Sequence, residues 1–238
     1  MKTDKKREEI IAALKEIYDT ENVMAERDGK LICRIRHKEN GREFILKSLN
    51  ETLPVYWFLA GINCANLPRV YEVFECEDGA VLIEEYVRGT LLSDISSVRR
   101  LDYKEAKRIM TQLCGVLSYL HENGYVHRDI KPENVMLCGD NVKLIDFDAA
   151  RMYNADKTSD TRVLGTLGYA SPEQFGVTQS DARVDIYALG VLLNVMLTGV
   201  HPSEAVAPGR AGRIVLKCTQ INPKLRYKSA ARLAAALR

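Results

Sequence analysis

Three dipeptides in the first third of the chain most restrict what it can fold into. Asp28-Gly29, Asn40-Gly41 and Asp78-Gly79 each separate two runs that are rich in β-branched, aromatic or other apolar residues. Asn-Gly and Asp-Gly accept the positive φ angles that two-residue hairpin turns require. Their placement predicts an antiparallel sheet of about five strands.

Two short helices are predicted beside this sheet. An apolar stripe near the start has helical spacing and predicts a helix docked on the sheet; its members are Ile10, Ile11, Leu14, Ile17 and Tyr18. Residues 50–66, which include Trp57 and Phe58, are predicted to form one short apolar helix.

The rest of the chain has a helical character. Asp102 and Glu105 form a capping-box pattern that opens a helix, and Asn123-Gly124 closes it. A hairpin is expected about 139–141, a long polar loop over 148–180, a buried helix over 186–198, a loop over 200–212 and helical segments at both ends of 213–237. A β-rich lobe, residues 1–88, is therefore expected to precede a mainly helical lobe, residues 89–238.

Composition restricts the classes of function. Lys+Arg 34 against Asp+Glu 32 leaves a net charge of +2, which argues against nucleic acid as a bulk electrostatic partner. The six cysteines include no CxxC pair, so they are expected to be reduced core thiols in a reducing compartment. The longest apolar stretch, 186–197, is too short to span a bilayer, and the first ten residues hold no apolar run. We expect a cytoplasmic protein without a membrane segment; its oligomeric state is not indicated.

The run HRDIKPEN, residues 127–134, carries the most chemical information, and DFD follows at 146–148. Taken alone, a His-Arg-Asp turn is also consistent with a surface salt bridge. Together the two motifs resemble the eukaryotic-type (Hanks-type) serine/threonine protein kinases, whose catalytic loop reads HRDxKxxN and whose metal-binding turn reads DFG. The resemblance extends to GTLGYASPE (165–173), DIYALG (185–190) and Arg226 within NPKLRY.

The resemblance implies an α+β, bilobal protein-kinase fold, with a small antiparallel β-sheet lobe and a larger helical lobe. It also implies ATP- and Mg²⁺-dependent phosphorylation of serine or threonine hydroxyls in protein substrates, with Mn²⁺ as an alternative metal. Two other functions stay open. One is a pseudokinase that binds nucleotide weakly, or not at all, and acts as a scaffold or allosteric partner. The other is a small-molecule kinase of the aminoglycoside type. The segment 165–173 and Arg226 argue against the last, because in the family they organise a platform for protein substrates.

The chemistry of phosphoryl transfer explains why these residue types are needed. A carboxylate, Asp129, would accept or orient the proton of the substrate hydroxyl, and Lys131 would reach the γ-phosphate as a point charge. Asn134 and Asp146 offer the hard oxygen ligands that magnesium prefers. Lys47 matches the family's β3 lysine, which holds the α- and β-phosphates; the alternative is a lysine that protects the edge of the sheet.

The resemblance assigns further positions. Those expected around the nucleotide are Ile32, Ile45, Glu84, Glu85, Val87 and Met136. Those expected to support the site are His127, Phe147, Thr166, Glu173, Asp185 and Arg226.

Three positions depart from the family pattern. The glycine-rich lid is replaced by AERDGKLI (25–32), whose one glycine, Gly29, belongs to a hairpin turn and leaves a weaker phosphate grip. The helix glutamate that pairs with the lysine is missing, since Val55 stands near its place. We hypothesise that Glu84 pairs with Lys47 instead; the alternative is an ordinary strand charge. Asp148 replaces the glycine of DFG.

A phosphate-binding pocket for the activation loop is also implied. Arg128 and Arg151 stand where relatives bind a phosphate with arginines. The candidate phosphorylation sites are Thr158, Ser159 and Thr161. The alternative is that the two arginines form ion pairs with Asp156 or Asp160.

Overall fold

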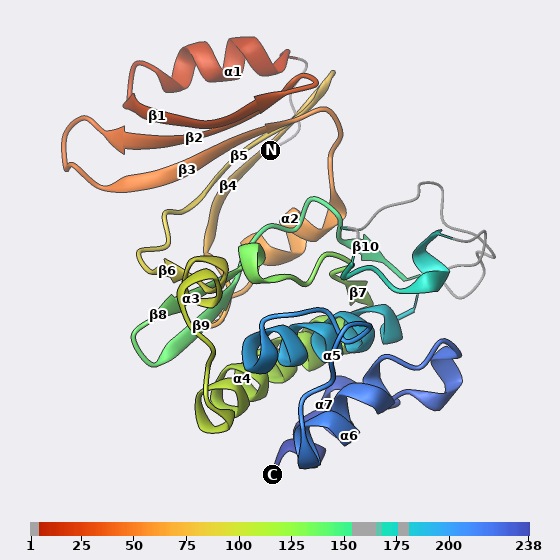
Figure 1. The fold of residues 1–238 in the computed structure, drawn as a ribbon. Helices are drawn as coiled ribbons and strands as arrows, with labels where there is room; N and C mark the ends of the chain where they lie inside the picture. The colour runs from red at the N-terminus through yellow and green to blue at the C-terminus, as the bar shows by residue number, and fades with distance from the viewer. Residues whose placement is uncertain (1–4, 154–165, 167, 176–180) are drawn as a thin grey trace. The chain divides into compact units, whose positions relative to one another are not determined.

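The computed structural model describes residues 5–153, 166, 168–175 and 181–238. The chain divides into two compact units (Figure 1). The first comprises Met1–Cys64 and Pro68–Arg88, and the second comprises Ala65–Leu67 and Gly89–Arg238. A sheet in the first unit and helices in the second confirm the predicted α+β class.

The first unit contains a five-stranded antiparallel sheet in the order β1-β2-β3-β5-β4. Its strands are β1 (Tyr18–Arg27), β2 (Lys30–His37), β3 (Glu43–Leu49), β4 (Val70–Cys76) and β5 (Gly79–Glu85). Asp28 and Gly29, with φ angles of 51° and 74°, form the predicted two-residue turn between β1 and β2. Asn40-Gly41 lies instead in a longer connection, 38–42, between β2 and β3. At the β4–β5 turn, a Cβ on Gly79 would lie 2.0 Å from the carbonyl oxygen of Leu49, so only glycine fits there.

Helix α1 (Arg7–Leu14) covers one face of this sheet (Figure 1). The core beneath it consists of Leu14, Cys33, Ile35, Phe44, Leu46, Cys76, Val81 and Ile83. The predicted helical stripe was too long, because Ile17 and Tyr18 lie beyond the helix. The carbonyl of Ile17 already accepts the backbone N–H of Lys38 at 3.0 Å, and Tyr18 begins β1. Pairing with the strand therefore ends the helix.

Helix α2 (Pro54–Ala60) is shorter than the predicted 50–66. Pro54 occupies its first turn, where a missing N–H costs nothing, and the helix ends at Gly61. Val55, Tyr56 and Leu59 are its buried residues. This short helix thus buries three side chains in the first unit.

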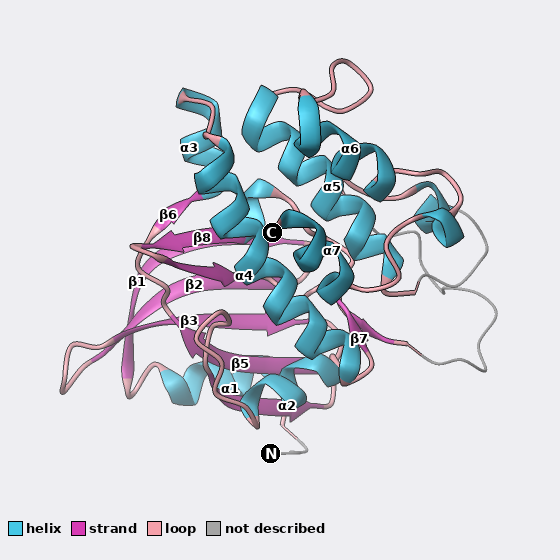
Figure 2. Ribbon diagram, turned by 90° about the horizontal axis from the view of Figure 1, so that it is seen from below, coloured by secondary structure: helices cyan, strands magenta, loops and turns pink. Residues whose placement is uncertain are grey.

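The second unit is built on long helices (Figure 2). In α4 (Tyr103–Glu122) the predicted capping box is confirmed, since Asp102 accepts the Glu105 N–H at 2.8 Å and Glu105 accepts the Asp102 N–H at 3.0 Å. Helix α5 (Arg183–Thr198) is the predicted buried helix. Helices α6 (Gly209–Cys218) and α7 (Ala230–Leu237) pack against α5 and α4 respectively.

One prediction for this unit was wrong, and one helix was missed. The loop expected over 200–212 ends earlier, because α6 begins at Gly209, after Pro208 as its N-cap. Helix α3 (Leu92–Val98) was not predicted. It buries Leu92 alone, so it has no apolar periodicity that a sequence pattern could reveal.

Short elements lie between these helices. Strands β6 (Thr90–Leu91), β8 (Val135–Cys138) and β9 (Asn141–Leu144) form a three-stranded sheet that contains the predicted hairpin. Strand β7 (Tyr125–Val126) pairs with β10 (Arg151–Met152). The described part of this unit also contains the 3₁₀ turns η1 (Pro132–Asn134), η2 (Pro172–Phe175) and η3 (Pro223–Leu225). Within the described residues, none of the helices combines the length and apolar character that crossing a bilayer requires.

Candidate active site

The backbone of the loop that follows β7 is held by one carboxylate of α5. Asp185 is completely buried, and it accepts the N–H of His127 at 3.0 Å and that of Arg128 at 2.8 Å. Its second contact is His121 on α4, whose Nε2 lies 2.7 Å away. Burial raises the pKa of Asp185, but the hydrogen bonds from His121 and from the Arg128 backbone oppose burial and the pKa is lowered overall. Asp185 is therefore an ionised anchor for the loop.

His127 has a supporting position. Its imidazole is buried and packs edge-on against the ring of Phe147, with centroids 4.8 Å apart. Burial lowers the pKa of His127, although Asp185, Asp146 and Asp129 oppose the shift. A neutral imidazole in the core links the loop to the 146–148 turn.

Asp129 lies at the centre of a small polar cluster. Lys131 Nζ is 2.8 Å from Asp129 Oδ2 and 2.8 Å from Thr166 Oγ1. The Thr166 hydroxyl donates to Asp129 Oδ1 at 2.7 Å. Both carboxylate oxygens of Asp129 are thus oriented by neighbouring donors, while its side chain keeps 15% exposure to solvent.

Asn134 adds a further hydrogen bond to this carboxylate. Its Nδ2 donates to the Asp129 carbonyl at 2.8 Å and to Asp129 Oδ2 at 3.0 Å, which turns the amide oxygen away from Asp129. The Asn134 carbonyl accepts the Ile145 N–H at 2.9 Å, so the next residue, Asp146, is held beside Asn134. Asp146 has a φ of 63° and accepts the Asp148 N–H at 3.3 Å.

This pair of oxygen donors fits a magnesium ion. The amide oxygen of Asn134 and the carboxylate of Asp146 are hard ligands on adjacent segments. In the described residues, no group of three or more His, Cys, Asp or Glu side chains could hold a metal. A metal at Asn134 and Asp146 would therefore be completed by oxygens of a phosphorylated ligand and water, as is usual for magnesium.

The lysine of β3 has two close partners within the first unit. Lys47 is 4% exposed, and its Nζ lies 3.2 Å from Glu84 Oε1 and 3.2 Å from Tyr56 OH. Lys47 pairs with Leu82 across β3 and β5, so Glu84 is its diagonal neighbour on the same face. The hypothesised Lys47–Glu84 ion pair is present. The alternative of a sheet-edge lysine does not apply, because β3 is flanked by β2 and β5.

The other residues expected around a nucleotide are divided between the units. Ile32, Ile45, Glu85 and Val87 belong to the first unit and Met136, on β8, to the second. Ile45 is buried and shares the face of Lys47, two residues away along β3. Glu85 accepts the Arg69 backbone N–H at 3.0 Å. Their roles toward a nucleotide remain predictions.

The turn that replaces the glycine-rich lid is tied to its own unit. Asn50 Nδ2 donates to the Asp28 carbonyl at 2.6 Å, and Arg7 donates to the Gly29 carbonyl at 2.7 Å. Arg7 also contacts Asp78, in the β4–β5 turn, at 3.2 Å. The β1–β2 turn is therefore a tight hairpin fixed by side chains.

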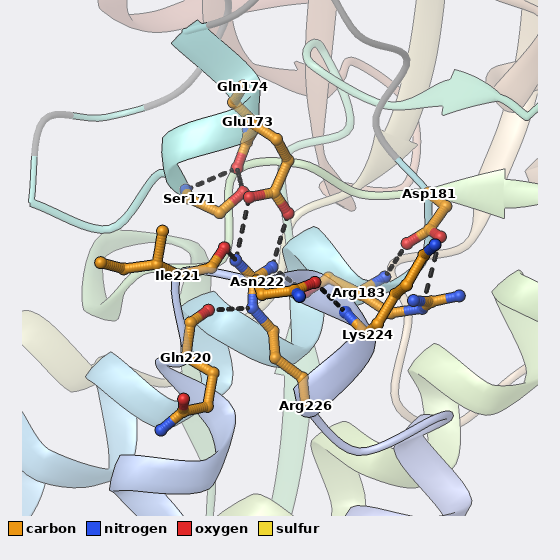
Figure 3. Close-up of polar contacts among 10 residues, drawn as sticks. All are labelled: Ser171, Glu173, Gln174, Asp181, Arg183, Gln220, Ile221, Asn222, Lys224 and Arg226. Atoms are coloured by element: carbon orange, nitrogen blue, oxygen red, sulfur yellow. Dashed lines mark hydrogen bonds and ion pairs between the residues drawn. The ribbon is translucent and has the colours of Figure 1, made fainter.

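The segment 171–175 is joined to the rest of the second unit by buried polar contacts (Figure 3). The Arg226 guanidinium, with 0% side-chain exposure, binds both carboxylate oxygens of Glu173, the Nη2–Oε2 contact being 2.9 Å. Gln174 accepts the Ser171 N–H at 3.0 Å and donates to the Arg128 carbonyl at 2.9 Å. The Glu173–Arg226 pair that the resemblance implied is present.

Sequence reasoning missed two residues here. Gln174 connects the Ser171 turn to the catalytic-loop backbone, and only its position next to the SPE motif could have suggested a role. Tyr56 contacts Lys47, and the one available signal was a polar group within an apolar helix. The proposed phosphate pocket is not tested. Thr158, Ser159 and Thr161 lie outside the described residues, while Arg151 Nη1 donates to the Ala150 carbonyl at 2.8 Å.

Comparisons with known proteins agree with this geometry. Residues 29–232 match the model of the protein kinase domain. The chain is 34% identical over 210 residues to the serine/threonine-protein kinase PknB of Mycobacterium leprae, covering 75% of this chain and 34% of that protein. It is 30% identical over 214 residues to a probable serine/threonine-protein kinase of Clostridium acetobutylicum, covering 79% of this chain and 32% of that one.

A mammalian relative extends the range of the similarity. The match to NUAK family SNF1-like kinase 1 of Mus musculus is 38% identical over 149 residues, or 61% of this chain and 22% of that protein. The chain thus spans about a third or less of the length of these curated relatives. From the matched domain and the motifs above, the chain belongs to the protein kinase family, and within it to the eukaryotic-type, or Hanks-type, serine/threonine kinases.

Proposed function

We propose that this chain transfers the γ-phosphoryl group of ATP to serine or threonine hydroxyls of proteins, itself included, with magnesium as its metal. The cluster of Asp129, Lys131 and Thr166 supports this most directly. It holds one partly exposed carboxylate beside an ammonium group, which is what a hydroxyl nucleophile and a charged phosphoryl group need.

In the proposed reaction, Asp129 accepts the proton of the substrate hydroxyl. The hydroxyl oxygen forms a bond to the γ-phosphorus while the bond from that phosphorus to the β,γ-bridging oxygen breaks, and ADP leaves. The Nζ of Lys131 is 2.8 Å from Asp129, so it lies close to the place where the hydroxyl would react. From there Lys131 stabilises negative charge on the transferred phosphoryl group. The hydroxyl of Thr166 holds the side chains of Asp129 and Lys131 in position.

Nucleotide binding is assigned to the remaining residues. Asn134 and Asp146 would hold magnesium, which neutralises phosphate charge during transfer. Lys47 would bind the α- and β-phosphates.

In this proposal residues 1–88 form the small lobe and residues 89–238 the large lobe. The six cysteines are free thiols, which suits a reducing, cytoplasmic location.

A nucleotide-binding scaffold that performs no transfer is the second candidate. The observation that favours it is the β1–β2 turn, which has one glycine and is held by Arg7 and Asn50. Such a turn offers fewer backbone N–H groups to phosphates than a glycine-rich loop does.

Transfer of radiolabel from Mg-ATP to the chain itself and to generic protein substrates tests the proposal. Asp129→Asn is expected to reduce transfer about 10²- to 10⁴-fold. The matched control is Asp19→Asn, at an exposed position of β1, which should transfer at the wild-type rate. Thermal stabilisation by nucleotide without transfer would support the scaffold, and the absence of both would contradict both candidates.

A further inference from the structure

The β3 lysine is held by an arrangement that differs from the one typical of protein kinases. In that family the lysine pairs with a glutamate on the helix that follows β3, and the position of this helix controls whether the pair forms. In this chain the helix that follows β3 is α2, and its residues that reach the core are Val55, Tyr56 and Leu59. Among them, only Tyr56 has a polar group.

Tyr56 and Glu84 are buried together with Lys47. Tyr56 is 1% exposed and Glu84 7% exposed. Besides the 3.2 Å contact of its hydroxyl with Nζ, the ring of Tyr56 has its centroid 5.5 Å from Nζ. A buried ammonium group needs both a counter-charge and hydrogen-bond acceptors. Glu84 supplies the charge, and Tyr56 supplies a second acceptor from a different direction.

The location of the counter-charge has a mechanical consequence. Glu84 and Lys47 lie on hydrogen-bonded neighbouring strands, in a register that places Ile45 opposite Glu84 and Leu82 opposite Lys47. The register of the sheet therefore fixes the spacing of their backbones. A displacement of α2 would remove the hydroxyl of Tyr56 but would leave the ion pair intact.

From these contacts we infer that Tyr56 is a positioning residue for Lys47, and that with Glu84 it replaces the missing helix glutamate. Glu84 supplies the counter-charge from the sheet, while Tyr56 fixes the direction of the ammonium group. The inference rests on the proposed function, in which Lys47 binds the α- and β-phosphates of ATP. It also implies that α2 adjusts nucleotide binding through a neutral hydroxyl rather than through a charge.

Nucleotide kinetics give the first test. Tyr56→Phe keeps the buried ring and removes the hydroxyl, so KM for ATP should rise about tenfold, the effect of one hydrogen bond to a charged group, while KM for the protein substrate stays unchanged. Glu84→Gln should raise KM for ATP further. Trp57→Phe, on the more exposed side of α2, is the matched control and should behave as wild type. An equal rise in both KM values for Tyr56→Phe would show a merely structural role and overturn the inference.

The second test needs neither nucleotide nor activity. In urea unfolding, Tyr56→Phe and Lys47→Met should be coupled: the effect of Tyr56→Phe on the unfolding equilibrium constant should differ at least about threefold between the Lys47 and Met backgrounds. In the chain that retains Lys47, acetylation of this lysine by acetic anhydride should be faster in Tyr56→Phe than in Trp57→Phe. The acetylation measurement decides the question should Lys47→Met fail to fold.

These two tests distinguish a failure of the inference about Tyr56 from a failure of the proposed function. No coupling and no change in acetylation would overturn the inference, whatever the nucleotide measurements show. Coupling together with changed acetylation supports it. A wild-type chain that binds no nucleotide would instead contradict the proposed function.

Discussion

Asp185 and Arg128 are joined by a hydrogen bond that holds a strained backbone. The carboxylate accepts the Arg128 N–H at 2.8 Å, and Arg128 has a φ of 71°, which L-residues other than glycine rarely adopt. Such a conformation costs about 1–3 kcal/mol and persists only where surrounding contacts compensate it. The buried carboxylate of α5 therefore determines the path of the loop that presents Asp129.

Asp185→Asn is expected to destabilise the chain. An amide has one acceptor oxygen where the carboxylate has two, so it cannot serve both backbone N–H groups and His121. Because bonds to a buried charge are strong, the free energy of unfolding should fall by about 2–4 kcal/mol. Urea unfolding measures this, with Asp94→Asn on the exposed side of α3 as a control. Equal stability of Asp185→Asn and wild type would contradict the anchoring role.

The lowered pKa of His127 predicts a pH dependence of stability. Because burial disfavours the charged imidazole, the unfolded chain binds a proton that the folded chain does not, below the ordinary histidine pKa of about 6.5. The stabilisation is complete above this pH and is lost as the pH falls toward the folded-state pKa. The slope approaches about 1.4 kcal/mol per pH unit.

Urea unfolding between about pH 7.5 and pH 5 checks this expectation, in a range chosen to lie above the titration of most carboxylates. His127→Leu should show a smaller decrease in the free energy of unfolding across this range than wild type. An identical pH slope in the two proteins would exclude His127 as its source.

The Glu173–Arg226 pair is expected to stabilise the second unit through its burial. Arg226→Met leaves the carboxylate of Glu173, which is 14% exposed, without its guanidinium partner and should cost about 3–5 kcal/mol. Combining it with Glu173→Gln should cost less than the sum of the two single changes, because the stranded charge is removed. A double-mutant cycle by urea unfolding tests this, and additive effects would mean that the two side chains are not coupled.

Thr166 is expected to affect transfer more than nucleotide binding. Its hydroxyl accepts from Lys131 at 2.8 Å and donates to Asp129 at 2.7 Å, so Thr166→Val should let both groups shift. Loss of one such bond at the transition state predicts a fall in kcat of about tenfold. Thr166→Ser keeps the hydroxyl and should retain most activity. Steady-state kinetics decide, and a serine variant as slow as the valine variant would contradict a role for the hydroxyl.

Phosphorylation is expected at Thr158, Ser159 or Thr161 when the chain is incubated with Mg-ATP. A phosphate adds up to two negative charges and strong acceptors that Arg128 and Arg151 could bind. Mass spectrometry of wild type and Asp129→Asn identifies the sites and shows whether the chain itself modifies them. Absence of phosphate from residues 153–166 in active protein would contradict the phosphate pocket. It would favour the alternative, in which the two arginines form ion pairs with Asp156 or Asp160.

Local sequence signals predicted the elements whose conformation depends on few neighbours. The turn at Asp28-Gly29 and the capping box of Asp102 and Glu105 are determined within four residues, and both were predicted correctly. Helix α3 and the ends of α2 were not, because helices of seven residues have too few turns to show an apolar period.

The site shows the same division. The spacing within HRDIKPEN brings Asp129, Lys131 and Asn134 together, since they lie within six residues of one another in one loop. Glu84 could be suggested only through alignment with a family, and Tyr56 only as a polar group within an apolar helix. Glu84 lies on strand β5 and Tyr56 on helix α2, and both contact Lys47 on β3. Spacing along the sequence does not reveal such contacts between different elements.

The amino-acid sequence by itself determined where the chain turns, which helix begins at a capping box and which residues are candidates for the chemistry. Those properties follow from the φ preferences of single residues and from short-range spacing. Only the tertiary structure decided that the counter-charge of Lys47 lies on the sheet, that Tyr56 completes its surroundings and that Gln174 bonds to the loop of Asp129. Such contacts depend on strand register and helix docking, which arise from the packing of the whole core and not from any local segment.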